Sequence, residues 1–313
     1  MEIVRYSNEL RNLWNENLVL SRTPHFMFHR DYIEYHSDRF EDCSFIFINR
    51  KGKIVALFPA NIDGEIIFSH QGLSFGGLIL SKTALSIDVH EIFSVLISWI
   101  AKNTSVKKLI YKKIPEIYST QPNQEDLYYL HKLGASIFRR DLSTTINLND
   151  PLPFQSMRRR LAQKGAKADL KIQKSTPSEI WPTLESVLFE RHNVRPVHSM
   201  SEMTLLRNLF QENIFCWAAK YKESVLSCVI IYDACSVAHA QYIANSELGR
   251  SFGALDFLFQ ELIEIHYADN LFFDFGISCE KEGTYLNQGL INQKQGFGGR
   301  GIVHDFYELT IER

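Results

Sequence analysis

The two halves of the chain carry the same order of expected structural elements, and this repetition restricts the possible folds more than any other feature. Residues 45–148 predict a hairpin, a strand, a long helix, a strand, a short helix and a final strand, and residues 214–309 predict the same series. The two short helices end in Lys132-Leu133-Gly134 and Lys294-Gln295-Gly296, each just before the final strand. Because a repeated series indicates tandem copies of one unit, we expect an α/β protein of two similar domains.

The first half predicts short strands and amphipathic helices after a helical, aromatic-rich segment over residues 1–40. Apolar runs bounded by glycine and polar residues predict strands, and apolar residues at helical spacing predict helices. The expected strands are Phe45–Asn49, Ile54–Ala60, Glu65–Phe68, Leu78–Leu80, Lys108–Tyr111 and Ser136–Leu148, and the expected helices are Ile87–Ile100 and Glu125–Leu133. Pro151 and Pro153 then interrupt regular structure. We therefore expect one domain over residues 1–150 and a second over residues 151–313.

The second half begins with expected helices and then repeats the series. The expected helices are Phe154–Ala168, Pro177–Glu190, Ser201–Phe210 and Ala254–His266, and the expected strands are Ile214–Lys220, Val225–Tyr232 and Val237–Ala244. Leu271–Gly276 predicts a buried strand that a glycine stops, and residues 302–309 predict the closing strand. Between them a helix is expected to begin at Tyr285, because Tyr285, Leu286, Leu290 and Ile291 recur at helical spacing.

Composition excludes several classes of protein. With 313 residues, 45% of them hydrophobic, the chain can bury a large core, and its net charge of −2 does not indicate a nucleic-acid or membrane-surface protein. The apolar runs are too short for a membrane span, and no signal peptide is recognisable at the start. The five cysteines form no CxxC pair, which favours reduced thiols in a cytoplasmic protein. No metal-binding motif occurs, and no metal is expected.

Two motifs near the end of the chain carry a family resemblance. Asn287-Gln288-Gly289-Leu290 and the segment from Gln293 to Gly299, followed by an aromatic strand, resemble the FemAB-like branch of the GNAT N-acyltransferases. The resemblance implies two tandem GNAT-like domains, each a mixed, mostly antiparallel sheet flanked by helices. It also implies transfer of an acyl group to an amine, with residues 151–313 on the acyl-donor side and residues 1–150 on the acceptor side.

The resemblance leaves the substrates open. We expect acetyl-CoA or another acyl-CoA as donor, and an amino sugar or nucleotide-sugar precursor of a surface glycan as acceptor. One alternative is an aminoacyl-tRNA-dependent transferase that acts on a peptidoglycan bridge or a lipid. A second alternative is a glycan-binding protein that kept the fold without the chemistry. The oligomeric state is open as well.

The expected donor site lies along one strand and the turn after it. Backbone N–H groups of Gln241, Tyr242 and Ile243 would polarise the acyl carbonyl group. The segment from Arg250 to Leu255 is similar to the GNAT turn Q/R-x-x-G-x-G/A, in which Arg250, Gly253 and Ala254 would hold donor phosphate at a helix N-terminus. Leu255 departs from the last small position of that pattern. Asn287 is a further candidate for donor binding, and an ordinary strand-to-helix turn is the alternative for the whole segment.

Three residues are candidates for proton transfer. Glu280 is the first choice as general base, because it follows the glycine that ends a buried strand. His239 is the second candidate, although a histidine on an apolar strand is often a hydrogen-bonded core residue. Tyr285 would protonate the leaving group, unless it only packs. On a regular strand His239 and Tyr242 point to opposite faces, so both can line one wall only if a bulge intervenes.

Polar loops are candidates for the acceptor. His70 and Ser74 belong to a glycine-rich interruption between strands, and Arg195 and His198 belong to a segment between helices. Asp274 is expected either to contact substrate or to be a structural acid. Each loop could instead be an ordinary surface connection. The segment Arg158–Lys174 has seven basic residues and one acidic residue, and could either attract phosphates or form a solvated face.

Overall fold

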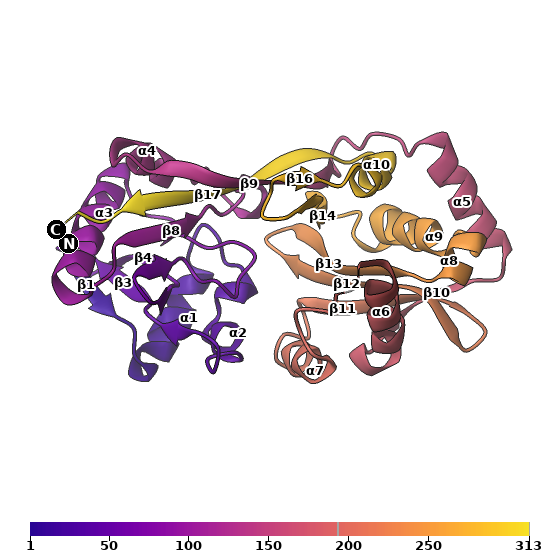
Figure 1. The fold of residues 1–313 in the computed structure, drawn as a ribbon, viewed down its shortest axis with the longest axis horizontal. Helices are drawn as coiled ribbons and strands as arrows, with labels where there is room; N and C mark the ends of the chain where they lie inside the picture. The colour runs from indigo at the N-terminus through magenta and orange to yellow at the C-terminus, as the bar shows by residue number, and fades with distance from the viewer. Residues whose placement is uncertain (193, 313) are drawn as a thin grey trace. The chain divides into compact units, whose positions relative to one another are not determined.

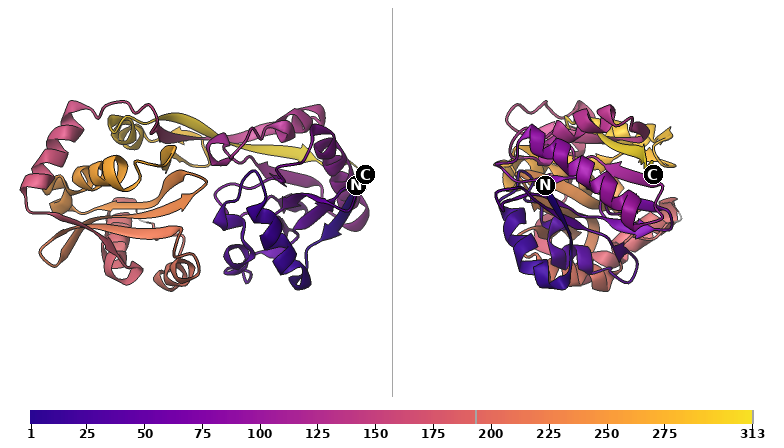
Figure 2. Two further views of the ribbon diagram at one scale, coloured as in Figure 1. Left: turned by 180° about the vertical axis from the view of Figure 1, so that it is seen from behind. Right: turned by 90° about the vertical axis from the view of Figure 1, so that its left-hand side faces the viewer.

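The computed structural model describes residues 1–192 and 194–312, and the chain forms two compact units. Unit 1 comprises residues 1–141, 281–284 and 303–313, and unit 2 comprises residues 142–280 and 285–302. Both ends of the chain therefore belong to unit 1 (Figure 2). The division falls inside a strand near residue 141, whereas the sequence placed a boundary at residues 150 and 151.

Unit 1 contains two sheets and the helices that cover them (Figure 1). One sheet has the order β1-β3-β4-β7, and the other strands of unit 1 belong to an 11-stranded sheet, in which they follow the first part of β9 (Ser136–Asn147) in the order β17-β8-β6-β5-β2. The strands are β1 (Glu2–Arg5), β2 (Glu41–Asp42), β3 (Phe45–Ile48), β4 (Ile54–Phe58), β5 (Asn61–Asp63), β6 (Ile66–Phe68), β7 (Ile79–Leu80), β8 (Lys108–Lys112) and β17 (Arg300–Thr310). The α-helices are α1 (Arg11–Val19), α2 (Arg30–Glu34), α3 (Ser86–Asn103) and α4 (Glu125–Lys132).

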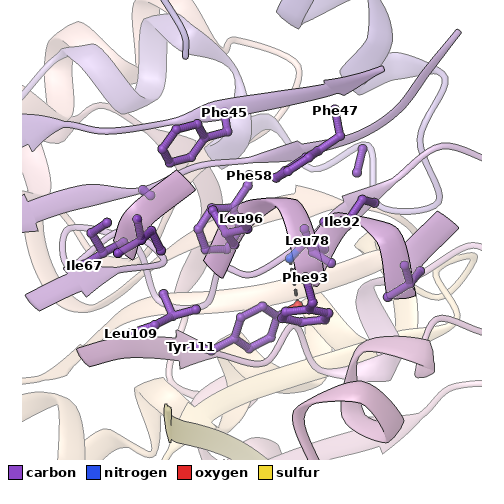
Figure 3. Close-up of a cluster of buried hydrophobic side chains, with 14 of the residues drawn as sticks. Phe45, Phe47, Phe58, Ile67, Leu78, Ile92, Phe93, Leu96, Leu109 and Tyr111 are labelled. Atoms are coloured by element: carbon purple, nitrogen blue, oxygen red, sulfur yellow. Dashed lines mark hydrogen bonds between the residues drawn. The ribbon is translucent and has the colours of Figure 1, made fainter. Parts of the chain in front are cut away.

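The core of unit 1 is an aromatic and aliphatic cluster between α3 and the strands (Figure 3). The rings of Phe58, Phe93 and Tyr111 lie close together in it, and all three side chains are buried. The hydroxyl of Tyr111 accepts a hydrogen bond from Leu78 N at 2.8 Å and donates one to Asp126 at 2.6 Å. Because a buried hydroxyl needs partners, these two bonds fix the ring and attach α4 to the sheet.

Unit 2 is built on one sheet with helices on both faces (Figure 1). Its strands, in the order β10-β11-β12-β13-β14-β9, are β10 (Lys171–Ser175), β11 (Ile214–Tyr221), β12 (Ser224–Ala234), β13 (Val237–Asn245), β14 (Phe272–Ile277) and the second part of β9 (Ser136–Asn147). Its α-helices are α5 (Ser156–Lys167), α6 (Pro177–His192), α7 (Met200–Leu209), α8 (Glu247–Phe252), α9 (Ala254–Glu261) and α10 (Gln288–Gly296). Leu262–His266 continues α9 as a π-helical turn, and β15 (Cys279–Glu280) pairs with β16 (Tyr285–Leu286).

The final strand of each half of the sequence pairs with a strand of the other half. In unit 2, β14 is parallel to β13 and antiparallel to β9, which precedes the two prolines. In unit 1, β8 is parallel to β6 and antiparallel to β17, the last strand of the chain. The expected series of elements is therefore present in both halves. The partner of each closing strand is supplied by the other half of the chain.

Three local expectations were wrong. The segment before residue 40 begins with a strand, β1, and not with a helix. Residues 61–68 form a hairpin of β5 and β6, where one strand was expected. Tyr285 and Leu286 lie in β16, and the following helix starts only after Asn287, whose side chain accepts a hydrogen bond from Leu290 N at 2.9 Å. Asparagine is a strong N-cap residue, so the helix begins where its cap is and not where the apolar spacing begins.

Across residues 1–192 and 194–312, no helix combines the length and the apolar character that a membrane crossing requires.

Candidate functional site

The two central parallel strands of unit 2 part from each other partway along their length. Their register pairs Val237 with Phe272 and His239 with Asp274, and no later pair follows in the described part of β13 and β14. Beyond His239, β13 continues to Asn245 along β12 alone. The Gln241 to Ile243 segment therefore has one backbone edge without a strand partner in β14. Such an edge can supply N–H donors to a ligand.

A β-bulge on β13 changes which side chains share a face. Tyr242 is opposite Ile230 and Ala240 is opposite Ile231, so Gln241 is the extra residue. Because an inserted residue reverses the alternation after it, His239 and Tyr242 lie on the same face. The sequence allowed His239 and Tyr242 to share a face only if a bulge intervened, and the bulge at Gln241 meets that condition.

His239 and Asp274 form a pair at the point where the strands part. The His239 Nδ1 atom lies 2.7 Å from Asp274 Oδ2. The other carboxylate oxygen accepts hydrogen bonds from the hydroxyls of Ser143 at 2.7 Å and Thr145 at 2.8 Å, both on β9. Asp274 is completely buried. Its burial and its partners favour the structural role over substrate contact, the two roles that the sequence left open, and as a structural acid it holds the histidine ring.

The space between the parted strands is a pocket of about 320 Å³. Ile243 of β13 and Phe275 of β14 line it, together with Leu188 of α6 and Phe259 of α9. Helices α6 and α9, which both pack on the sheet, each contribute to the lining. Its charged lining residues are Arg158, Arg250, Asp256 and Lys294.

The expected phosphate-binding turn is present but covered. Gly253 separates α8 from α9 with a φ of 73°, as a left-handed turn requires. A Cβ atom on Gly253 would lie 2.2 Å from Leu161 O, because α5 packs directly on this turn. Asp256, in the first turn of α9, is paired with Arg158 Nη1 of α5 at 2.8 Å. The carboxylate of Asp256 therefore occupies the N-terminus of α9, the position at which a helix would otherwise attract the anion of a ligand.

The other donor-side residues have local roles. Arg250 is exposed and donates from Nη1 to Asn245 O at 3.0 Å, while Ala254 is fully buried at the start of α9. Gly253 and Ala254 therefore serve the packing of α5, α8 and α9. Asn287 caps α10 and donates to Glu280 Oε1 at 2.7 Å.

Tyr242 fixes the loop before α7. Its hydroxyl accepts a hydrogen bond from His198 N at 3.2 Å and lies 2.7 Å from His198 Nδ1. Burial raises the pKa of Tyr242, while backbone donors of His198 and Val197 lower it. His198 is buried, so it supports this tyrosine and is not an open contact for substrate. Arg195, by contrast, is exposed.

Glu280 and Tyr285 lie on the small ribbon of β15 and β16 and are both exposed. A general base is normally held in a site that excludes water from its neighbours. His239, with its buried carboxylate partner, meets this requirement better than Glu280. The signal for this pair was present in the sequence as His239 and Asp274, but their register could not be known before the strands were paired.

The polar loop of unit 1 is organised by a buried lysine. Lys112 Nζ donates to the carbonyl oxygens of His70 at 3.0 Å, Gln71 at 3.0 Å and Leu73 at 2.7 Å. His70 is fully buried and adopts a φ of 66°, whereas Ser74 is exposed. His70 is therefore part of the packed loop, and only Ser74 of the two expected acceptor residues is open to solvent.

Within the described ranges, no group of three or more histidine, cysteine, aspartate or glutamate side chains could hold a metal ion. The five cysteines are free thiols, and burial raises the pKa of the Cys43 thiol to about 11.

Neither a protein-family model nor a curated protein matches this chain. Solved structures do match it. FemX has 11% identity and a TM-score of 0.68, with 98% of this chain and 97% of that chain covered. L-PGS from Bacillus licheniformis has 11% identity and a TM-score of 0.63, with 99% and 93% covered. A tandem GNAT protein from the clavulanic acid biosynthesis pathway has 10% identity and a TM-score of 0.53, with 100% and 99% covered.

At sequence identities of 10 to 11%, the structural similarity establishes the fold alone. The chain has the tandem GNAT fold that FemX and the tandem GNAT protein share. The fold class and the FemAB-like resemblance expected from the sequence are therefore confirmed at the level of the fold.

Proposed function

We propose that unit 2 transfers an acyl group from an activated donor to an amine. The observation that carries this proposal is the pocket between β13 and β14, which lies in the sheet beyond the His239–Asp274 pair. A donor bound there would present its carbonyl group to the unpaired backbone edge of β13. The tandem GNAT fold supports the proposal, although the fold alone does not determine the chemistry.

The residues divide the chemical steps among them. His239 accepts a proton from the attacking amine, and Asp274 keeps the ring oriented and stabilises the imidazolium form. Backbone N–H groups of Gln241 to Ile243 stabilise the developing oxyanion. A C–N bond forms and the bond from the acyl carbon to the carrier breaks. The proton that His239 took from the amine then passes to the leaving group, a role first expected for Tyr285.

Two donors are to be compared. Acyl-CoA is the donor that a GNAT-like site suggests. Aminoacyl-tRNA is favoured by the Asp256 carboxylate at the start of α9, which repels a phosphate group there. It is also favoured by the exposed basic side chains of α5 outside that pair, which can follow a nucleic-acid backbone. These side chains are Arg159, Arg160, Lys164 and Lys167.

The proposed acceptor is an amino group on a sugar or nucleotide-sugar precursor of a surface glycan. In unit 2, the exposed guanidinium group of Arg195 can contact hydroxyl or phosphate groups of such a molecule. A lipid or peptide amine is the alternative acceptor, in keeping with a solved neighbour that is named a putative lysylphosphatidylglycerol synthetase. The second alternative is a glycan-binding protein without catalytic activity. Such a protein would bind the sugar but would bind no acyl donor.

The test first determines which acyl donor binds, and then whether His239 acts as the general base. Thermal unfolding is measured with acetyl-CoA, longer acyl-CoAs, aminoacyl-tRNA and nucleotide amino sugars, because a ligand that binds the folded state raises the melting temperature. Acyl transfer is then assayed with the donor that binds. His239→Gln should lower kcat by about 10²- to 10⁴-fold with donor affinity retained, and His131→Gln in the last turn of α4 is the control. Unchanged turnover in His239→Gln would exclude it as the base.

A further inference from the structure

Lys294 is a buried lysine that connects α10 with the end of β14. Its Nζ atom donates to Gly276 O at 2.8 Å and to Ile277 O at 2.7 Å. Only 4% of the residue is exposed, and it lines the pocket between β13 and β14. Two consecutive carbonyl groups are thus held by one ammonium group, and such charge-assisted bonds are stronger than bonds between neutral groups.

The carbonyl groups that Lys294 holds belong to the bend at which β14 leaves β13. The last pair of the two strands is His239 with Asp274, two residues before Gly276. Gly276 has a φ of 74°, in the left-handed region that favours glycine, and the register of β14 against β9 shifts between Asp274 and Ile277. A Cβ atom on Gly276 would lie 3.3 Å from His239 Cε1. The bend therefore shapes both the pocket and the wall beside the proposed base.

The two arginines that line the pocket are bonded elsewhere. Arg158 is engaged by Asp256, and Arg250 donates to Asn245 O on β13. Of the four charged residues that line the pocket, Lys294 is the one whose side chain donates hydrogen bonds to the bent end of β14. Without the ammonium group, both carbonyl groups would lose a charge-assisted hydrogen bond, which is stronger than a bond between neutral groups.

We propose that Lys294 is a positioning residue: its ammonium group holds the bent end of β14 away from β13 and so keeps the pocket open for the acyl donor. The identity of the ligand rests on the proposed function, whereas the mechanical role of Lys294 does not. The role is one of geometry, so an arginine, which keeps the charge and the donors, should largely preserve it.

The first experiment measures the bend without any substrate. Hydrogen exchange of the backbone amides in the segment 276–280 is followed in the full-length protein and in Lys294→Met and Lys294→Arg. Lys294→Met should speed exchange in this segment by about tenfold or more, since charge-assisted bonds are lost. Lys294→Arg should remain within about threefold of the wild type, because its donors remain. The control is Lys112→Met, which removes a buried lysine with carbonyl partners in unit 1 and should leave the segment unchanged.

The second experiment measures donor affinity by calorimetry, with acetyl-CoA as the probe. Lys294→Met should weaken binding by about tenfold or more, Lys294→Arg should restore most of it, and Lys112→Met should not alter it. Equal exchange in the wild type and Lys294→Met, or an equal loss of affinity in Lys112→Met, would overturn the positioning role. If the wild type itself binds no acetyl-CoA, the acyl-CoA donor is excluded, and the exchange result alone decides the role of Lys294.

Discussion

A completely buried carboxylate such as that of Asp274 is tolerated only where donors surround it. Ser143, Thr145 and His239 supply side-chain contacts, and Gly276 N donates at 3.3 Å. The carboxylate therefore joins β9, β13 and the bend of β14. A residue that satisfies so many neighbours is fixed, and this is why it can orient His239 and cannot itself contact substrate.

We expect Asp274→Asn to lower the free energy of unfolding by about 3 kcal/mol. The amide N–H₂ group would face a side chain that now donates to the carboxylate, and the negative charge beside His239 would be lost. Urea unfolding measures this. Ser143→Ala, which removes a single donor, should cost about 1 kcal/mol. Equal stability of Asp274→Asn and the wild type would show that the carboxylate is not the structural centre of this network.

The choice of Glu280 as general base shows how far the local sequence around a residue can predict its role. Glu280 follows a glycine after a buried strand, a position that often carries chemistry. Nothing in the sequence indicated that the ribbon of β15 and β16 would leave it exposed. His239 and Asp274 are 35 positions apart, and only the parallel register of β13 and β14 brings them together.

Among the elements, α5 shows how closely packed helices limit side chains. Gly165 of α5 would place a Cβ atom 2.7 Å from Phe257 Cβ, and Gly253 would place one 2.2 Å from Leu161 O. Two glycines thus allow α5 and α9 to approach each other closely. The packing of α5 on α9 therefore accounts for a glycine at position 253, where the sequence resembles a phosphate-binding turn.

Gly253→Ala should lower the free energy of unfolding of unit 2 by at least about 3 kcal/mol, because the left-handed backbone and the contact with α5 both oppose a side chain. Gly134→Ala is the matched comparison, since Gly134 has a φ of 77° but no atom within 4 Å of the added Cβ. It should cost only about 1 kcal/mol. Thermal unfolding followed by circular dichroism gives both values, and similar costs at the two positions would contradict the packing argument.

For the molecule as a whole, the exchange of closing strands makes each half of the sequence incomplete. Unit 2 needs residues 142–147 of β9, which bring Ser143 and Thr145 to Asp274. A cut at the prolines would remove that strand from unit 2 and leave a buried carboxylate with fewer partners.

We predict that a fragment of residues 142–302 folds and that a fragment of residues 151–313 does not. The first contains all the unit 2 strands from β9 to β14, whereas the second exposes the edge of β14 and lacks the donors to Asp274. Near-UV circular dichroism and amide NMR spectra distinguish a packed fragment from an unfolded one. A well-folded 151–313 fragment would show that β9 is dispensable.

Two of the buried lysines, Lys112 and Lys294, predict how stability depends on pH. Burial and the nearby Arg139 lower the pKa of Lys112 to about 7, and burial lowers that of Lys294 to about 8 against the opposing effects of Asp274 and Cys279. Both begin from 10.5 in the unfolded chain. Between these values the unfolded chain binds protons that the folded chain does not, so the free energy of unfolding rises with pH.

Urea unfolding between pH 7 and pH 7.5, about one pH unit below the ordinary pKa of an unfolded thiol, should therefore show a positive slope. The double variant Lys112→Met/Lys294→Met should show a smaller one. Equal slopes in the two proteins would mean that neither lysine titrates abnormally.

Much of this protein follows from its sequence. Apolar periodicity located α3, α4, β3, β4, β8, β9 and β11 to β14 near their observed bounds, because local spacing records which side of an element is buried. The order of these elements and two glycine-rich motifs led to the tandem GNAT fold. Tertiary structure alone decided the bulge at Gln241, the exposure of Glu280, the cover that α5 forms over Gly253 and the exchange of β9 and β17. Each of these depends on contacts between residues distant in the chain, and a local pattern contains no information about such contacts.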